Sequence, residues 1–100
     1  TGTDWTPKVH TAIWKKGAIS TDWNTASNWS TGNVPTADVN VIIPTGSSNY
    51  PTITGSNATC NNLTIYSSAS MTLNDSYSLT ISGEFRNMGS VFVNGDLIVQ

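Results

Sequence analysis

The chain is 100 residues long, enough for one modest domain, and 37% of its residues are hydrophobic. Only 10% are charged, and four basic residues against six acidic ones give a net charge of −2. This balance argues against binding to nucleic-acid backbones and to anionic membranes, and no apolar run reaches the roughly 18 residues that a membrane-spanning helix needs.

The surface is expected to be rich in hydroxyl and amide groups. Thr, Ser and Asn supply 39 of the 100 residues, and they favour strands, turns and caps over helix. The chain starts at Thr1 without a signal peptide, as expected of a mature export product or of a piece cut from a longer protein. These features predict an all-β protein that is secreted, either extracellular or held at the cell surface.

Residues 1–35 are predicted to form a Trp-rich N-terminal cap. This segment contains all four tryptophans, three of the four basic residues and the single histidine, His10. A regular pattern begins only after Pro35. Large indoles are suited to covering the end of a β-structure, where unpaired backbone and apolar side chains would otherwise meet water.

Residues 36–100 are predicted to form short β-strands. Apolar residues recur in pairs separated by one other residue, which is the period-2 pattern of a strand with one buried face. Gly, Asn, Ser and Pro between the pairs indicate turns. The pairs are Val39/Val41, Leu63/Ile65, Met71/Leu73, Leu79/Ile81, Val91/Val93 and Leu97/Val99.

The spacing of the pairs predicts how these strands are arranged. Every third strand begins 18 to 22 residues after its counterpart, as in the steps Leu63 to Phe85, Met71 to Val91 and Leu79 to Leu97. This period fits a three-faced parallel β-solenoid (β-helix), with Leu63 directly beneath Phe85. The alternative is an antiparallel, immunoglobulin-like β-sandwich, which fits less well because the chain has a single Asn-Gly and no Asp-Gly hairpin signal.

The strand pattern is still in progress at the end of the chain. Leu97, Ile98 and Val99 continue it without a polar cap, and they are the candidate stacking end of the solenoid. We therefore expect the coils of residues 36–100 to continue beyond Gln100 or to be completed by another subunit. The expected partners are further coils of the same chain or other copies of it.

The tryptophans have an alternative interpretation as a carbohydrate-binding platform. Indole faces stack on sugar rings, and neighbouring amides and carboxylates bind sugar hydroxyls. Surface glycans would then be the partners of the chain, and the function would be that of a carbohydrate-binding module. The candidate platform consists of Trp14, Trp23, Trp29, Asp22, Asn24 and Asn28.

The sequence offers no catalytic apparatus, and we expect no enzyme activity and no cofactor. Glu84 and Arg86 flank Phe85 and share the outward face of a strand, where such a pair is usually a solvated ion pair. A fragment of a polysaccharide-acting enzyme is a second alternative, although no pair of carboxylates is grouped for it. A calcium site built on Asp22 or Asp38 with carbonyl oxygens also stays open.

Several segments carry a family resemblance. The text WKKGAISTDWNTASNWSTGNVPTADVNVIIP, which begins at Trp14, resembles the opening β-solenoid module of large type IX-secreted bacterial cell-surface, adhesin-like proteins. YPTI from Tyr50, ATCNNLTI from Ala58 and SLTISGEF from Ser78 resemble the continuation of that module. The resemblance implies extracellular display and a structural or adhesive role in a surface protein or filament.

Overall fold

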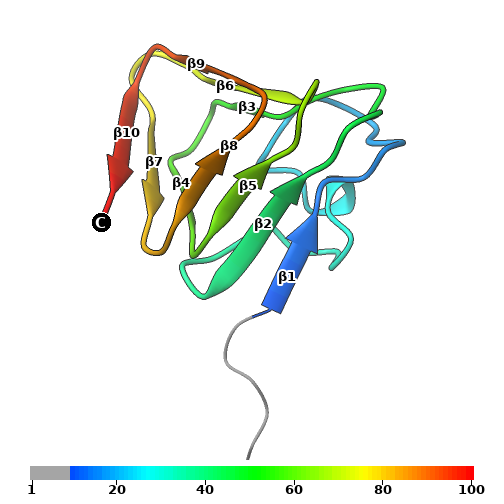
Figure 1. The fold of residues 1–100 in the computed structure, drawn as a ribbon, viewed down its shortest axis with the longest axis horizontal. Coiled ribbons are helices and arrows are strands. Elements are labelled where there is room, and N and C mark those ends of the chain that lie inside the picture. Colours follow the sequence, from blue (N-terminus) through cyan, green and yellow to red (C-terminus); the bar gives the residue numbers. More distant parts are fainter. Residues whose placement is uncertain (1–9) are drawn as a thin grey trace, which may run out of the picture.

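The computed structural model describes residues 10–100 and is almost entirely β-structure in this range (Figure 1). The one helical element among these described residues is a single 3-10 turn, η1 (Ala26–Asn28). The strands are two to five residues long: β1 (His10–Ile13), β2 (Val39–Ile43), β3 (Thr52–Ile53), β4 (Ala58–Cys60), β5 (Leu63–Ile65), β6 (Ser70–Leu73), β7 (Ser78–Ile81), β8 (Phe85–Asn87), β9 (Ser90–Val93) and β10 (Asp96–Val99).

The strands form three parallel sheets. The first has the order β1-β2-β5-β8, the second β3-β6-β9 and the third β4-β7-β10. From β2 onward, successive strands of the chain therefore lie in different sheets, and each strand from β2 to β7 pairs with the strand one coil later (Figure 1). This is the topology of a parallel β-solenoid with three faces, and it confirms the predicted fold over an antiparallel sandwich.

The register is the one that the apolar spacing predicts. Leu63 pairs with Phe85, and the other two predicted steps pair as Met71 with Val91 and Leu79 with Leu97. Residues at alternate positions point into the coil and are buried in β5, β6 and β7, whereas the threonines between them are partly exposed. The core is thus a stack of aliphatic side chains in register between coils.

Two corner glycines allow consecutive coils to approach closely. A Cβ at Gly89 would lie 2.2 Å from the carbonyl oxygen of Ala69, and one at Gly95 would lie 2.2 Å from that of Tyr77. Both atoms belong to the backbone of the preceding coil and cannot rotate away. A side chain at either position would therefore push the coils apart.

The N-terminal segment wraps around the first regular coil. Strand β1 pairs in parallel with β2 and adds a fourth strand to the first sheet. Asp22 makes a parallel bridge to Thr52 of β3, and Trp14 makes an antiparallel bridge to Trp29. Residues 10–35 therefore form an irregular first coil of the solenoid that contains one strand of its own. Residues 1–9 of the predicted cap, with Trp5, lie outside the described residues.

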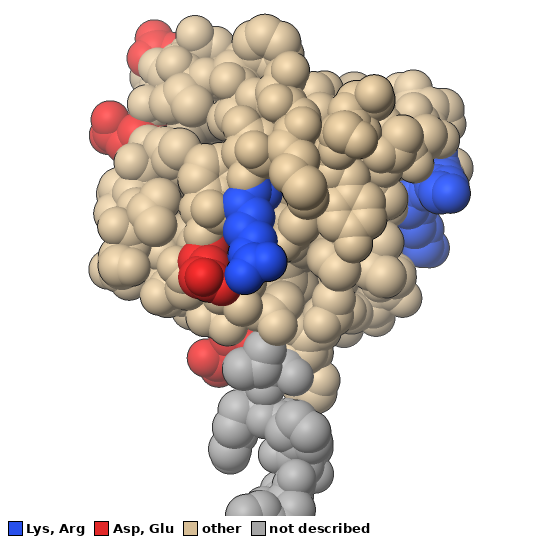
Figure 2. Space-filling view, viewed as in Figure 1, with Lys and Arg blue, Asp and Glu red and all other residues tan. Residues whose placement is uncertain are grey.

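The surface is mostly uncharged, as expected from the composition. Figure 2 shows a few Lys, Arg, Asp and Glu side chains scattered over a face that is otherwise uncharged. Across residues 10–100, no helix is long and apolar enough to cross a membrane.

Candidate functional site

The three tryptophans at the start of the solenoid form a buried cluster, called here the Trp cluster (Trp14, Trp23 and Trp29). None of them has exposed surface. Trp29 lies between the other two, with ring centroids 5.1 Å from Trp14 and 4.8 Å from Trp23 and edge-to-face geometry in both pairs. The Nε1–H of Trp14 donates to the carbonyl oxygen of Asn49 (2.7 Å), and that of Trp29 donates to the carbonyl oxygen of Trp23 (2.8 Å).

The polar residues between the tryptophans hold the loop in place. Asn28 is fully buried. Its Oδ1 accepts from the N–H of Ile19 (2.9 Å), and its Nδ2 donates to Ser20 Oγ and to the carbonyl oxygen of Asp22, both at 3.0 Å. The Asp22 carboxylate accepts from Thr25 Oγ1 and from the N–H of Asn24, both at 2.9 Å. A buried polar network of this kind fixes one loop conformation because each unmade hydrogen bond is costly.

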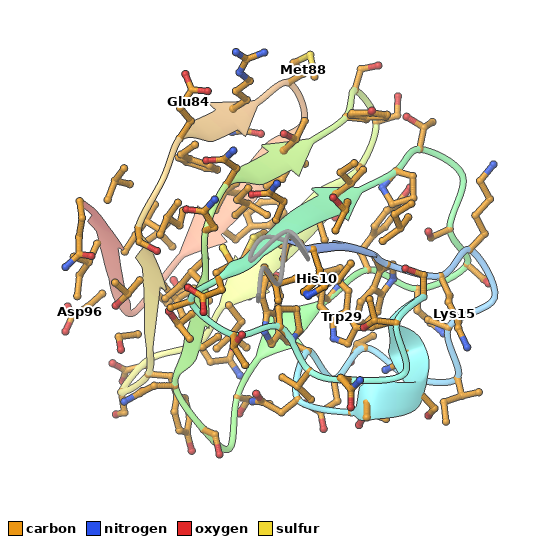
Figure 3. All side chains as sticks on the ribbon, turned by 90° about the horizontal axis from the view of Figure 1, so that it is seen from below. His10, Lys15, Trp29, Glu84, Met88 and Asp96 are labelled. Atoms are coloured by element: carbon orange, nitrogen blue, oxygen red, sulfur yellow. The ribbon has the colours of Figure 1, made fainter. Side chains whose placement is uncertain are left out.

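These contacts correct the proposed carbohydrate platform. The structure does bring Trp14, Trp23 and Trp29 together, but the indoles pack edge to face and are fully buried, so they present no surface for a sugar ring. Asn24 is also engaged, since its Nδ2 donates to the carbonyl oxygens of Thr54 (3.1 Å) and Ser56 (3.2 Å). The cluster fills this end of the coil, called here the closed end, and Trp29 lies beside η1 (Figure 3).

The opposite end of the solenoid is open. Strands β8, β9 and β10, called here the last coil, are the outermost strands of their three sheets, and among residues 10–100 no strand pairs with their outer edges. In the preceding coil Leu63, Leu73 and Ile81 are fully buried, whereas the side chains stacked on them are partly or well exposed. Those side chains are Phe85, Val93 (46% exposed) and Val99 (51% exposed).

The outward face also changes character at the last coil. In the preceding coil each sheet carries an outward-pointing threonine. In the last coil another residue type occupies the equivalent position of each sheet. Of the eight well-exposed large hydrophobic side chains within residues 10–100, five lie from Met88 to Val99, so exposed apolar surface is concentrated here. The replacements are Thr64 by Arg86, Thr72 by Phe92 and Thr80 by Ile98.

The predicted stacking residues all lie in β10 of this coil. Leu97 points inward onto Leu79 and is partly buried, whereas Ile98 points outward and is 43% exposed. Sequence reasoning missed that β8 and β9 share the open edge with β10. Figure 3 places Glu84, Met88 and Asp96 of this end far from Lys15 and Trp29 of the closed end.

The last coil carries one ion pair on its outer face. Arg86 Nη2 lies 3.5 Å from Glu84 Oε1, and the two side chains are 68% and 70% exposed. This confirms the expected solvated pair, and such a pair contributes little to stability. With Asn62 and Thr64, the two residues line a shallow polar hollow.

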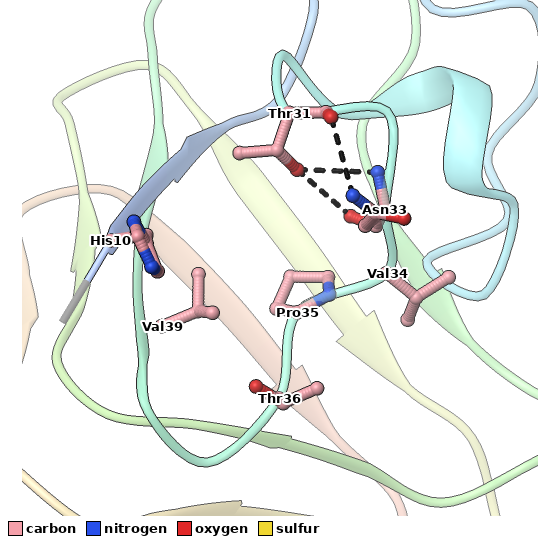
Figure 4. Close-up of a pocket in the computed structure, with 7 residues that line it drawn as sticks. All are labelled: His10, Thr31, Asn33, Val34, Pro35, Thr36 and Val39. Atoms are coloured by element: carbon pink, nitrogen blue, oxygen red, sulfur yellow. Dashed lines mark hydrogen bonds between the residues drawn. The ribbon is translucent and has the colours of Figure 1, made fainter. Parts of the chain in front are cut away.

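A separate hollow lies beside the closed end. It has a volume of about 560 Å³ and is lined by side chains of the segment that leads into β2 and by His10 of β1 (Figure 4). Thr31 and Asn33 bond to each other there: Thr31 Oγ1 donates to the carbonyl oxygen of Asn33 (3.1 Å) and accepts from its N–H (3.2 Å). The hollow is mainly an apolar surface formed by Val34, Pro35 and Val39.

Metal-ligating and nucleophilic groups do not gather in the part of the chain that the structure describes. Within residues 10–100, no three His, Cys, Asp or Glu side chains are placed to hold a metal ion. Cys60 is a buried core residue of β4, and desolvation raises the pKa of its thiol to about 12. A thiol of this kind is inert, because the thiolate is the reactive form.

Comparison with known protein families identifies the family of the chain. The sequence profile of DUF8693, a domain of unknown function, matches residues 13–99. The chain belongs to this family. No curated protein and no solved structure is significantly similar to it. The matched range runs from the last residue of β1 to the last residue of β10, so the irregular first coil and the last coil both belong to the family's domain.

Proposed function

We propose that the chain is a non-catalytic structural or adhesive module of an extracellular bacterial surface protein or filament, and that its open end is covered by another β-coil. The difference between the two ends supports this proposal. Three buried tryptophans close one end. At the other end, inward side chains such as Val93 and Val99 pack on one side only and are about half exposed.

A strand edge of this kind favours pairing. An outermost strand carries a row of unpaired N–H and C=O groups, and proteins that avoid pairing at such an edge usually shield it. Here three such strands lie together, and the apolar side chains between them increase the gain from covering the edge. A single exposed ion pair is the one charged feature at β8.

Hydrogen–deuterium exchange of the monomer at low concentration tests the proposal. Amides that bond β8, β9 and β10 to the preceding coil are expected to exchange faster than those between β2 and β5, because the last coil has a neighbour on one side only. Equal protection in the two regions would mean that the last coil needs no cover, and the proposal would fail. Antibody labelling of intact cells of the source organism tests the surface location.

A further inference from the structure

We propose that the partner at the open end is a second copy of the chain, docked tail to tail. In this arrangement β8 of each copy runs antiparallel to β8 of the other, about a two-fold axis that passes through Phe85. The inference rests on the proposed function of the open end and names its partner. Four features of β8 and its surroundings support it.

The first feature is the backbone of β8. The carbonyl oxygen of Glu84 accepts from the N–H of Leu63 (2.9 Å), and the N–H of Met88 donates to the carbonyl oxygen of Ile65 (2.8 Å). Backbone groups alternate sides along a strand, so Phe85 and Asn87 direct their N–H and C=O groups away from β5. With the axis at Phe85, the two copies of this residue form a hydrogen-bonded antiparallel pair.

The second feature is side-chain parity. When the two-fold axis of an antiparallel pair passes through a residue, inward-pointing positions of one copy lie opposite inward-pointing positions of the other. An axis between two residues would instead place inward-pointing positions opposite outward-pointing ones. Phe85 points inward because it stacks on Leu63. Only axes through a residue therefore keep both apolar faces on the same side.

The third feature is charge, and it favours the axis at Phe85. An axis at Asn87, whose backbone also faces away from β5, would place Arg86 opposite Met88 and give neither charge a partner across the contact. An axis at Glu84 would place Glu84 opposite its own copy, and an axis at Arg86 would place the two guanidinium groups together. An axis at Phe85 places Glu84 of each copy opposite Arg86 of the other. The existing ion pair (3.5 Å) then becomes part of a four-charge network with alternating signs. Opposite charges directly across a strand pair stabilise it, and like charges destabilise it.

The fourth feature is that the closed end offers a poorer surface. At the outer side of β1, the carbonyl oxygen of Ile13 accepts from the N–H of Ser30, and the N–H of Ile13 donates to Ser30 Oγ, both at 2.9 Å. A head-to-tail stack would have to break these bonds. A tail-to-tail contact uses the same surface twice, as in most homodimers.

Sedimentation of the whole chain and of charge-reversed variants tests the pairing. The wild type is expected to dimerise with a dissociation constant below about 1 mM. Glu84→Arg or Arg86→Glu is expected to raise this dissociation constant at least about tenfold, because two attractive contacts become repulsive. The double variant Glu84→Arg/Arg86→Glu should regain the dimer. An equimolar mixture of the two single variants should form a mixed dimer.

Matched controls and contrary results are defined by the same experiment. Lys15→Glu and Asp75→Arg change the charge by the same amounts at exposed sites outside the last coil, and neither should alter the association. A wild type that remains monomeric would overturn the proposal. A dimer that neither single reversal weakens, or that the double variant does not regain, would also overturn it. The exchange experiment would still decide separately whether the open end needs a cover.

Discussion

The Oδ1 atom of Asn40 accepts a hydrogen bond from the backbone N–H of Asn62, which lies 22 residues further along the chain (3.2 Å). It also accepts from Asn61 Nδ2 (2.9 Å). One coil later, Asn62 Oδ1 accepts from the N–H of Glu84 (2.8 Å). At the corner that leads into the first sheet, side-chain hydrogen bonds therefore link successive coils in addition to the pairing of the strands.

Asn40→Ala is expected to lower the free energy of unfolding by about 1 kcal/mol, because it leaves two donors without an acceptor. Asn40→Asp keeps an oxygen that can accept both hydrogen bonds, and its stability should stay close to that of wild type. Thermal unfolding followed by circular dichroism measures the difference, which amounts to about 4–8 °C per kcal/mol for a chain of this size. Asn94→Ala, at an exposed corner, is the control and should change little.

Trp29→Phe is expected to destabilise the closed end by about 1–3 kcal/mol, because the carbonyl oxygen of Trp23 loses its buried donor. Trp29→Ala should cost about 3–5 kcal/mol, because it also leaves a cavity between the other two indoles. Urea unfolding measures both changes. Ile19→Ala, at a side chain that is 75% exposed, should be nearly neutral. A neutral Trp29→Ala would contradict the role of the cluster as a buried cap.

Gly89→Ala is expected to destabilise the chain by about 1–3 kcal/mol, because the new methyl group would lie 2.2 Å from a backbone oxygen of the preceding coil. Gly17→Ala is the matched control, since its Cβ would meet nothing within 4 Å. It should be neutral or slightly stabilising. Chemical denaturation of the two variants side by side makes the comparison, and equal midpoints would refute the close approach of the coils.

The raised pKa of Cys60 predicts a loss of stability in alkaline solution. The thiol has a pKa of about 12 when folded against 9.0 for the free group. Above pH 9 the unfolded chain has lost this proton and the folded chain keeps it, so the free energy of unfolding falls as the pH rises from 9 toward 12. Cys60→Ala should lose less stability than wild type over that range, and the native thiol should react slowly with a thiol reagent at pH 8.

A lysine among the stacked inward-pointing side chains should be tolerated in the last coil but not in the coil before it. Val93 is 46% exposed and stacks on Leu73, which is fully buried. Val93→Lys should change the free energy of unfolding of the monomer by less than about 1 kcal/mol, whereas Leu73→Lys should prevent folding, because a buried unpaired charge costs several kcal/mol. Circular dichroism and thermal melts distinguish the two. A folded Leu73→Lys variant would show that the side chain at this position is not shielded from water.

The strands that the sequence predicts are those with two apolar residues in alternation. This pattern identified β2, β5, β6, β7, β9 and β10, and the spacing predicted the register of β5 with β8, of β6 with β9 and of β7 with β10. It missed β1 and β3, because each buries a single side chain within the strand, Ala12 and Ile53. One buried residue produces no alternation, so such strands become visible only through their partners.

The closed end shows a different limit. Indoles next to Asp and Asn side chains are what both a sugar platform and a buried cap require, so residue types alone left both interpretations open. The deciding facts are the edge-to-face packing of Trp29 and the four hydrogen bonds of the Asn28 side chain. Both depend on how the loop from Lys15 to Ser30 folds back. The exposure of the last coil was easier to anticipate, because Leu97 and Val99 still follow the apolar alternation of the coils before them.

The unequal ends of the solenoid also determine how the molecule would respond to force. A pull on the C-terminal side loads the few hydrogen bonds between β10 and β7 first, and these can break one after another from the free edge. A pull at the Trp cluster must instead shear a packed aromatic core and a buried amide network together. The closed end is therefore expected to resist force better than the last coil, whose strands can detach one at a time.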